Sequence, residues 1–144
     1  MKTLYTAHAT SIGGRSGHVE TDDKNLSLDL ASPGAPNAKT GSTNPEQLFA
    51  CGYSACFGSA LDHVAKSEKI SVKEIKVSAD ITLNQDDNGY SIGATLNVTL
   101  DGVDGPTAQR LVEAAHKVCP YSKATRGNVN VVLKVNNKDL IQAA

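Results

Sequence analysis

The chain has 144 residues and a formal net charge of −1, with 20% charged and 40% hydrophobic residues. A chain of this length forms one hydrophobic core by default, so we expect a single domain over residues 1–144. Acidic and basic residues are interspersed rather than collected in long blocks, which disfavours nucleic acid and anionic membranes as partners.

The amino terminus and the cysteine count indicate where the protein works. Residues 1–7 (MKTLYTA) lack the continuous apolar core of a signal peptide, and no stretch reaches the length of a membrane span. We therefore expect a cytoplasmic protein without a membrane partner. Three cysteines in a reducing compartment are kept as thiols, which favours transient or catalytic use. No metal site is expected, because there is no Cys-x-x-Cys pair and the four histidines are widely spaced.

The amino-terminal part reads as short strands followed by a loop. A strand is expected around residues 3–10, and a glycine-flanked turn follows at residues 13–17 (GGRSG). Alternating leucines predict a second strand at residues 26–30. Residues 31–41 contain prolines and glycines and read as an extended loop that could roof a site or reach another subunit.

A helix is predicted over residues 45–66. Asn44 can cap it, and a proline suits its first position because the missing N–H is not needed there. Residues 48–61 carry no charge and many small side chains, which predicts a central helix with neighbours on most sides. Gly52 and Gly58 each cost about 1 kcal/mol relative to alanine in a helix, so we expect close approach by another backbone.

The carboxyl-terminal part alternates strands with one amphipathic helix. Residues 75–83 and 92–100 alternate apolar and polar side chains, and the turn-forming residues 85–89 predict that they pair as an antiparallel hairpin. Residues 106–118 place an apolar stripe on one helical face, and residues 129–135 predict a last strand. The pattern as a whole predicts an α+β fold.

Two distant thiols invite redox chemistry. Cys56 lies in the middle of the first helix, and Cys119 lies at or just beyond the end of the second helix, which Pro120 terminates. A thiol is a strong nucleophile at neutral pH only when positive charge or hydrogen bonds lower its pKa from about 8.5. Arg15 is one candidate for that charge, and Glu46 could orient its guanidinium through a bidentate pair. A regular helix separates Glu46 from Cys56 by about 15 Å along its axis, so helix geometry does not explain a direct contact.

The third thiol is a poor disulfide partner for Cys56. Cys51 precedes it by five positions on the same helix, which puts their Cα atoms about 8 to 9 Å apart, beyond the reach of an unstrained disulfide. If Cys56 forms a disulfide, Cys119 is the better partner. We expect Cys51 to be a small buried core residue.

Each of these residues also has a purely structural interpretation. Cys56 can be a small buried hydrophobe, and Cys119 can pack at a helix end. Glu46 is a favourable carboxylate in a first helical turn, and Arg15 can be an exposed turn residue. Composition and spacing alone therefore leave a redox enzyme and a globular binding domain open.

Two separated segments, in order and spacing, resemble the signature segments of the organic hydroperoxide resistance proteins of the Ohr/OsmC family. The resemblance covers essentially the whole chain. It is carried by residues 44–49 (NPEQLF), 52–57 (GYSACF), 118–122 (VCPYS) and 124–128 (ATRGN), with similar residues at 5–7 (YTA) and 13–17 (GGRSG). Cys51 departs from the family pattern, in which a small apolar residue is usual.

The resemblance implies a thiol-dependent peroxidase built as an intertwined homodimer, with antiparallel β-sheets wrapped around two central helices. It implies that Cys56 attacks an organic hydroperoxide and that Cys119 resolves the product as a Cys56–Cys119 disulfide. It also implies that Arg15 and Glu46 hold the site in its reactive form.

The family further implies a dihydrolipoyl group on a lipoylated protein as the electron donor, with no cofactor bound to the chain itself. Three alternatives remain at this stage. One is a peroxidase of the osmotically inducible branch of the same family, the second is a noncatalytic dimeric binding module, and the third is a thiol redox sensor.

Overall fold

The computed structural model describes residues 1–140, which form three α-helices, one short 3-10 helix and seven β-strands. Contacts group the chain into two compact units, Met1–Leu48 and Phe49–Ala144. Each unit contains its own β-sheet. The single domain expected from chain length stays a prediction.

The first unit is built on a three-stranded antiparallel sheet with the order β1-β2-β3. Its elements are β1 (Ala9–Ile12), the 3-10 helix η1 (Gly14–Ser16), β2 (His18–Thr21) and β3 (Ser27–Asp29). The first strand begins at Ala9 and not near residue 3, because its partner β2 ends at Thr21, which pairs with Ala9. The glycine-flanked turn at residues 13–17 is therefore the connection between β1 and β2, and η1 carries Arg15.

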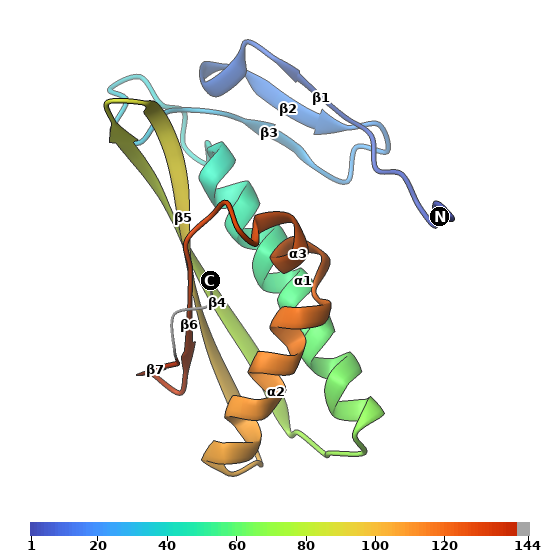
Figure 1. The fold of residues 1–144 in the computed structure, drawn as a ribbon. Coiled ribbons are helices and arrows are strands. Elements are labelled where there is room, and N and C mark those ends of the chain that lie inside the picture. The colour runs from blue at the N-terminus through green and yellow to red at the C-terminus, as the bar shows by residue number, and fades with distance from the viewer. Residues whose placement is uncertain (141–144) are drawn as a thin grey trace. The chain divides into compact units, whose positions relative to one another are not determined.

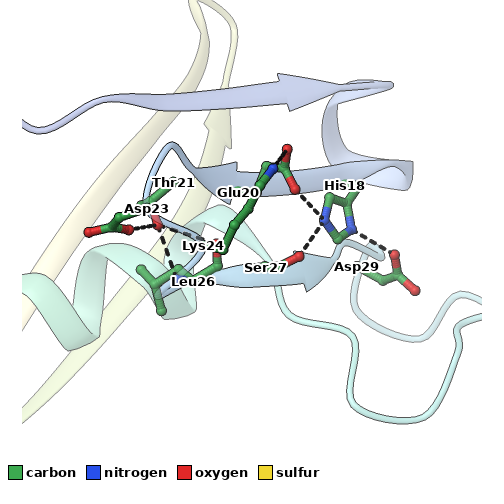
Figure 2. A network of polar contacts seen from close by, with 8 residues as sticks. All are labelled: His18, Glu20, Thr21, Asp23, Lys24, Leu26, Ser27 and Asp29. Carbon is green, nitrogen blue, oxygen red and sulfur yellow. Dashed lines mark hydrogen bonds and ion pairs between the residues drawn. The ribbon is translucent and has the colours of Figure 1, made fainter.

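A ladder of polar side chains joins β2 to β3 on one face of this sheet (Figure 2). His18 lies opposite Asp29 in the register, and its Nδ1 is 2.9 Å from Asp29 Oδ1, while its Nε2 is 3.0 Å from Ser27 Oγ. Glu20 Oε2 lies 3.7 Å from the same Nε2. Lys39 donates to Asp29 Oδ2 at 2.9 Å, which attaches the following loop to the sheet. Cross-strand pairs of this kind stabilise a small sheet. Here they hold β2, the strand that follows η1, against β3.

The predicted first helix is confirmed as α1 (Pro45–Ser67). The backbone N–H of Gln47 donates to Asn44 Oδ1 at 2.9 Å, so Asn44 is the helix cap that the sequence indicated. The helix presents two different faces. Tyr53, Phe57 and Leu61 are buried, whereas an opposite row is exposed: Cys51, Ala55, Ser59 and Asp62.

That exposed row differs from the expectation of neighbours on most sides. Positions spaced by three or four residues share one helical face, so the row forms a continuous strip of mostly small side chains. Within the described part of the chain, core packing covers only the other face of α1. A helix that the chain covers on one side only is free to meet a second molecule there.

The second unit holds a four-stranded sheet with the order β4-β5-β6-β7. Its strands are β4 (Glu74–Asp86), β5 (Gly89–Asp101), β6 (Val131–Val135) and β7 (Lys138–Asp139). The predicted hairpin of β4 and β5 is confirmed, and its strands extend further than the apolar alternation, leaving only Asp87 and Asn88 between them. This long ribbon forms one edge of the sheet (Figure 1).

One strand pair departs from the expected antiparallel sheets. β6 pairs parallel with β5, because the connection between them crosses over through α2 (Gly105–Val118) and α3 (Pro120–Thr125). A parallel pair needs a crossover of this length, usually helical, rather than a tight turn. The amphipathic helix at residues 106–118 is thus confirmed, and α3 is an element that sequence reasoning did not predict.

The core of the second unit lies between its helices and its sheet. Helices α1 and α2 run along the same face of the sheet (Figure 1), and their buried side chains form one cluster with those of β5 and β6. The largest side chains with almost no exposure include Tyr53, Phe57, Leu61, Leu96, Val98, Leu111, Val112 and Val131. Cys119 belongs to the same cluster and is fully buried.

Candidate active site

The first unit brings Arg15 and Glu46 together. Arg15 Nη1 donates to Glu46 Oε2 at 2.8 Å, and Nη2 donates to Oε1 at 2.6 Å. The pair is therefore the bidentate one that the sequence suggested. The glycines around Arg15 permit its tight turn, since Gly13 has φ 81° and Gly14 has φ 55°, where other residues are strained.

This pairing shifts the pKa of both groups so that each charged form is favoured. The hydrogen bonds from Arg15 lower the pKa of the Glu46 carboxyl, although burial opposes the shift. The hydrogen bond to Glu46 raises the pKa of the Arg15 guanidinium. Glu46 is thus ionised near neutral pH, and its negative charge also suits the first turn of α1.

The second unit brings Cys56 and Cys119 together. Cys119 Sγ donates to Cys56 Sγ at 3.7 Å, and both cysteines are free thiols. Cys119 is fully buried, whereas Cys56 is half-buried. A disulfide would need the two sulfurs to approach to about 2.05 Å, which is a small movement from van der Waals contact.

The surroundings of Cys56 in this unit disfavour its thiolate. Burial raises the pKa of the Cys56 thiol, and the adjacent Cys119 raises it further. The backbone of Tyr121 hydrogen-bonds to the sulfur and lowers the pKa, without cancelling the effect of burial. A thiol in this position needs an additional positive charge to become a strong nucleophile at neutral pH.

The expectation that Cys51 is a buried core residue is wrong. Its side chain is exposed, because it lies on the strip of α1 that the described chain leaves uncovered. Its thiol is free, as are those of Cys56 and Cys119, so the choice of a disulfide partner for Cys56 stays a prediction.

The glycines of α1 are approached by side chains and not by another backbone as predicted. A Cβ on Gly52 would lie 2.7 Å from Tyr121 Oη, so the tyrosine ring fills the space that glycine leaves. The same ring lies 5.8 Å from the ring of Phe49 and 5.7 Å from that of Tyr53, measured between centroids. Near Gly58 the contact is ordinary, with Val77 Cγ2 at 3.8 Å. Aromatic packing therefore attaches the segment after Cys119 to α1.

Sequence reasoning did not single out a buried polar network beside the thiols. Its members are Tyr53, His116, Ser122 and Thr125, and the exposed Arg126 donates to the backbone oxygen of His116. The sequence did contain a signal for it: a tyrosine and two hydroxyl residues stand close to the two cysteines, at positions that pack into the core. Buried polar groups are almost always hydrogen-bonded, so such residues predict a polar network.

Two further features bear on the class of the site. Within residues 1–140, none of the helices combines the length and apolarity required to cross a membrane. The same residues contain no group of three or more His, Cys, Asp or Glu side chains arranged to hold a metal ion.

The model of the OsmC-like protein family matches residues 37–134, which include the first helix, Cys56 and Cys119. The chain belongs to the OsmC-like protein family. OhrB of Bacillus subtilis, named an organic hydroperoxide resistance protein, is 50% identical over 133 residues, which cover 92% of the chain and 98% of OhrB. The OhrA protein of the same organism, with the same description, is 51% identical over 136 residues, covering 92% of the chain and 96% of OhrA.

The fold of this OsmC-like chain matches solved structures of the same group. The crystal structure of Bacillus subtilis OhrB aligns with a TM-score of 0.87 at 49% identity, covering 92% of the chain and 99% of OhrB. The predicted α+β class and the Ohr/OsmC resemblance are therefore confirmed. The homodimer stays a prediction.

Proposed function

We propose that this OsmC-like protein is a thiol-dependent peroxidase that reduces organic hydroperoxides to alcohols. One observation carries the proposal: a half-buried cysteine on α1 and a fully buried cysteine after α2 have their sulfurs 3.7 Å apart. Support comes from relatives near 50% identity that are named for organic hydroperoxide resistance. The osmotically inducible branch, a redox sensor and a binding module are the alternatives that an assay must separate.

In the first step the Cys56 thiolate attacks the distal oxygen of the hydroperoxide ROOH. An S–O bond forms, the O–O bond breaks, and the alkoxide leaves as the alcohol after taking up a proton. The peroxide gains two electrons, and Cys56 becomes a sulfenic acid. The half-buried position of Cys56 suits this role, because a substrate can reach it while Cys119 stays enclosed.

In the second step Cys119 attacks the sulfur of the Cys56 sulfenic acid. The S–S bond forms, the S–O bond breaks, and the hydroxyl leaves as water with the proton of the Cys119 thiol. The short distance between the sulfurs favours this step over a second oxidation by peroxide, which would give sulfinic acid.

In the third step a dihydrolipoyl group on a lipoylated protein reduces the Cys56–Cys119 disulfide. One of its thiolates attacks the disulfide, its second thiol closes the lipoyl disulfide, and both protein thiols are restored. The cycle thus requires no cofactor bound to the chain. We assign it to the cytoplasm, where reducing conditions keep cysteines free.

Arg15 and Glu46 complete the proposal as the groups that activate Cys56. Burial raises the pKa of the Cys56 thiol, so a guanidinium is the kind of charge its thiolate requires. In the first unit, Glu46 binds Arg15 through both carboxylate oxygens, which restricts the orientation of the guanidinium.

The roles of the two thiols can be tested in a single turnover. We expect Cys56→Ser to abolish peroxide consumption, because the attacking sulfur is removed. We expect Cys119→Ser to consume one equivalent and then stop as a sulfenic acid. Stopped-flow measurement of both variants decides the assignment, and Cys51→Ser is the matched control, expected to behave as the unaltered protein. A first turnover that survives in Cys56→Ser but is lost in Cys119→Ser would reverse the roles.

Substrate and reductant are tested together in steady state. An alkyl hydroperoxide can bury apolar surface worth about 25 cal/mol per Å², which hydrogen peroxide cannot, so we expect organic hydroperoxides to be preferred. We expect faster turnover with dihydrolipoamide than with glutathione. Turnover of an organic hydroperoxide with dihydrolipoamide should exceed turnover of hydrogen peroxide with glutathione by orders of magnitude. Equal kcat/KM for all four pairings would contradict an apolar site that selects organic substrates, whereas no turnover with any pairing would favour the sensor or the binding module.

A further inference from the structure

A polar cluster is enclosed in the apolar core next to the two thiols. Tyr53 and Ser122 have 0% exposure, Thr125 has 4% and His116 has 9%. Leaving a buried hydroxyl without a partner costs free energy, so such a cluster persists only if its members bind one another in a definite geometry.

Ser122 is the centre of this cluster. Its Oγ lies 3.0 Å from Tyr53 Oη and 3.0 Å from His116 Nδ1, and Tyr53 Oη lies 3.3 Å from Thr125 Oγ1. Burial, with a smaller effect of Arg126, lowers the pKa of His116, which favours the neutral imidazole. In the tautomer that carries its proton on Nε2, Nδ1 is an acceptor. In that tautomer Ser122 donates to His116 and its oxygen is left to accept from Tyr53, so one hydroxyl binds both partners.

The three partners come from three helices, and each is close in sequence to a thiol. Tyr53 lies on α1 three residues before Cys56, and His116 lies on α2 three residues before Cys119. Ser122 lies on α3 three residues after Cys119. The Ser122 hydroxyl therefore links the helix that carries the first thiol to both helices that flank the second.

Cys119 is the joint between these two helices. It is the C-cap of α2 and the N-cap of α3, with extended φ and ψ of −60° and 124°. A non-helical residue between two helices is where their relative direction can change. Arg126 Nη2 donates to the backbone oxygen of His116 at 2.6 Å, which adds a second connection between the end of α3 and α2.

We propose that Ser122, held between Tyr53 and His116, is the positioning residue that keeps Cys119 within attacking distance of Cys56. Ser122 touches no reacting atom in this assignment. It acts by fixing α3 against α1 and α2, so that the joint at Cys119 presents its sulfur 3.7 Å from its partner. Its consequence for peroxide reduction rests on the proposed function, whereas its effect on disulfide formation does not.

Thiol exchange with a dipyridyl disulfide tests the positioning without peroxide. The Cys56 thiolate attacks the reagent, giving a mixed disulfide and one thiopyridone. Cys119 then attacks Cys56 Sγ, forming the protein disulfide and releasing a second thiopyridone, which takes up the proton of the Cys119 thiol. Thiopyridone absorbance rises in two phases. The first phase reports the attack of Cys56 on the reagent, and the second reports the attack of Cys119 on the mixed disulfide. A Cys51→Ala background removes the exposed third thiol.

We expect Ser122→Ala and Tyr53→Phe to slow the second release tenfold or more and to leave the first unchanged. Displacement of a reacting group by about 1 Å can cost about a hundredfold in rate, so loosening α3 acts on resolution. Ser59→Ala is the matched control, because this exposed hydroxyl donates to the Ala55 backbone oxygen within α1, outside the buried polar cluster. His116→Gln retains a hydrogen-bonding side chain and should give an intermediate rate.

Three outcomes distinguish this inference from the function on which it builds. A second release at the unaltered rate in both Ser122→Ala and Tyr53→Phe overturns the positioning role. If the unaltered protein reduces no peroxide but the second release is slowed, the proposed function fails and the inference stands. If the peroxidase function and the positioning role of Ser122 are both correct, excess organic hydroperoxide should convert more Cys56 to sulfinic acid in Ser122→Ala than in Ser59→Ala. Mass spectrometry measures this product.

Discussion

Burial raises the pKa of Cys56, although a nucleophile at neutral pH must be a thiolate. A hydrogen bond from the backbone of Tyr121 opposes this rise. In the first unit, a guanidinium is held by both oxygens of Glu46. At the scale of single residues, the central question is whether Arg15 supplies the charge that Cys56 lacks.

Replacing Arg15 tests this directly. We expect Arg15→Ala to move the pH profile of Cys56 alkylation to higher pH, since loss of positive charge raises a thiol pKa. A shift of one pKa unit would slow peroxide attack at pH 7 by up to about tenfold, because the thiolate fraction falls by that factor. Arg15→Lys should restore only part of the rate, because lysine lacks the planar fork that binds Glu46.

The measurement is iodoacetamide alkylation of Cys56 against pH in the Cys51→Ala background, read by mass spectrometry. Arg110→Ala is the control, because this arginine pairs with Glu68 beyond the end of α1. An alkylation profile identical to that of the unaltered protein would remove Arg15 from the mechanism.

At the scale of elements, the end of α2 contains a buried histidine. His116 is 9% exposed, and burial lowers its pKa below the ordinary value of about 6.5. The unfolded chain therefore binds a proton at His116 at a higher pH than the folded chain does. The stability that His116 contributes is present above pH 6.5, and it is lost as the pH falls toward the lowered pKa of the folded state.

Thermal unfolding against pH should reveal this loss. We expect the Tm to fall further between pH 7.5 and pH 5.5 in the unaltered protein than in His116→Gln. Glutamine does not titrate and can still bind Ser122. His63→Gln, at an exposed position on α1, is the control and should follow the unaltered protein. Parallel curves for the unaltered protein and His116→Gln would contradict the coupling between His116 and folding.

At the scale of the whole molecule, the exposed strip of α1 is the feature that the described chain leaves uncovered. Ala55, Ser59 and Asp62 lie on it, and together with Val72 and Ile75 they line a hollow of about 530 Å³ in the second unit. Small side chains allow close helix approach, and family resemblance implies an intertwined homodimer. A second copy of the chain is the occupant that this resemblance predicts.

Light scattering after size exclusion should therefore give twice the chain mass. We expect Ser59→Arg to shift the protein toward the monomer, because a long charged side chain prevents close approach along α1 while leaving the buried face unchanged. Gln109→Arg, at an exposed position on α2, is the matched control and should remain dimeric. A monomer for the unaltered protein at micromolar concentration would contradict the dimer.

Periodic patterns predicted the elements well. The cap at Asn44, the bounds of α1 within a residue, the β4–β5 hairpin and the amphipathic α2 all follow from local rules, since caps, turns and alternation act over a few residues. The start of β1 and the parallel direction of β6 did not follow. Both depend on which strand lies alongside, which local patterns do not encode.

The sequence by itself determined the family, the helix that carries Cys56 and the choice of Cys119 over Cys51 as its partner, because these follow from motif spacing and from helix geometry. Only the tertiary structure decided that the two sulfurs lie 3.7 Å apart and that Ser122 connects Tyr53 to His116. It also decided that Cys51 is exposed. The physical reason is that distance and burial depend on how three helices pack, and packing joins residues more than sixty positions apart in the chain.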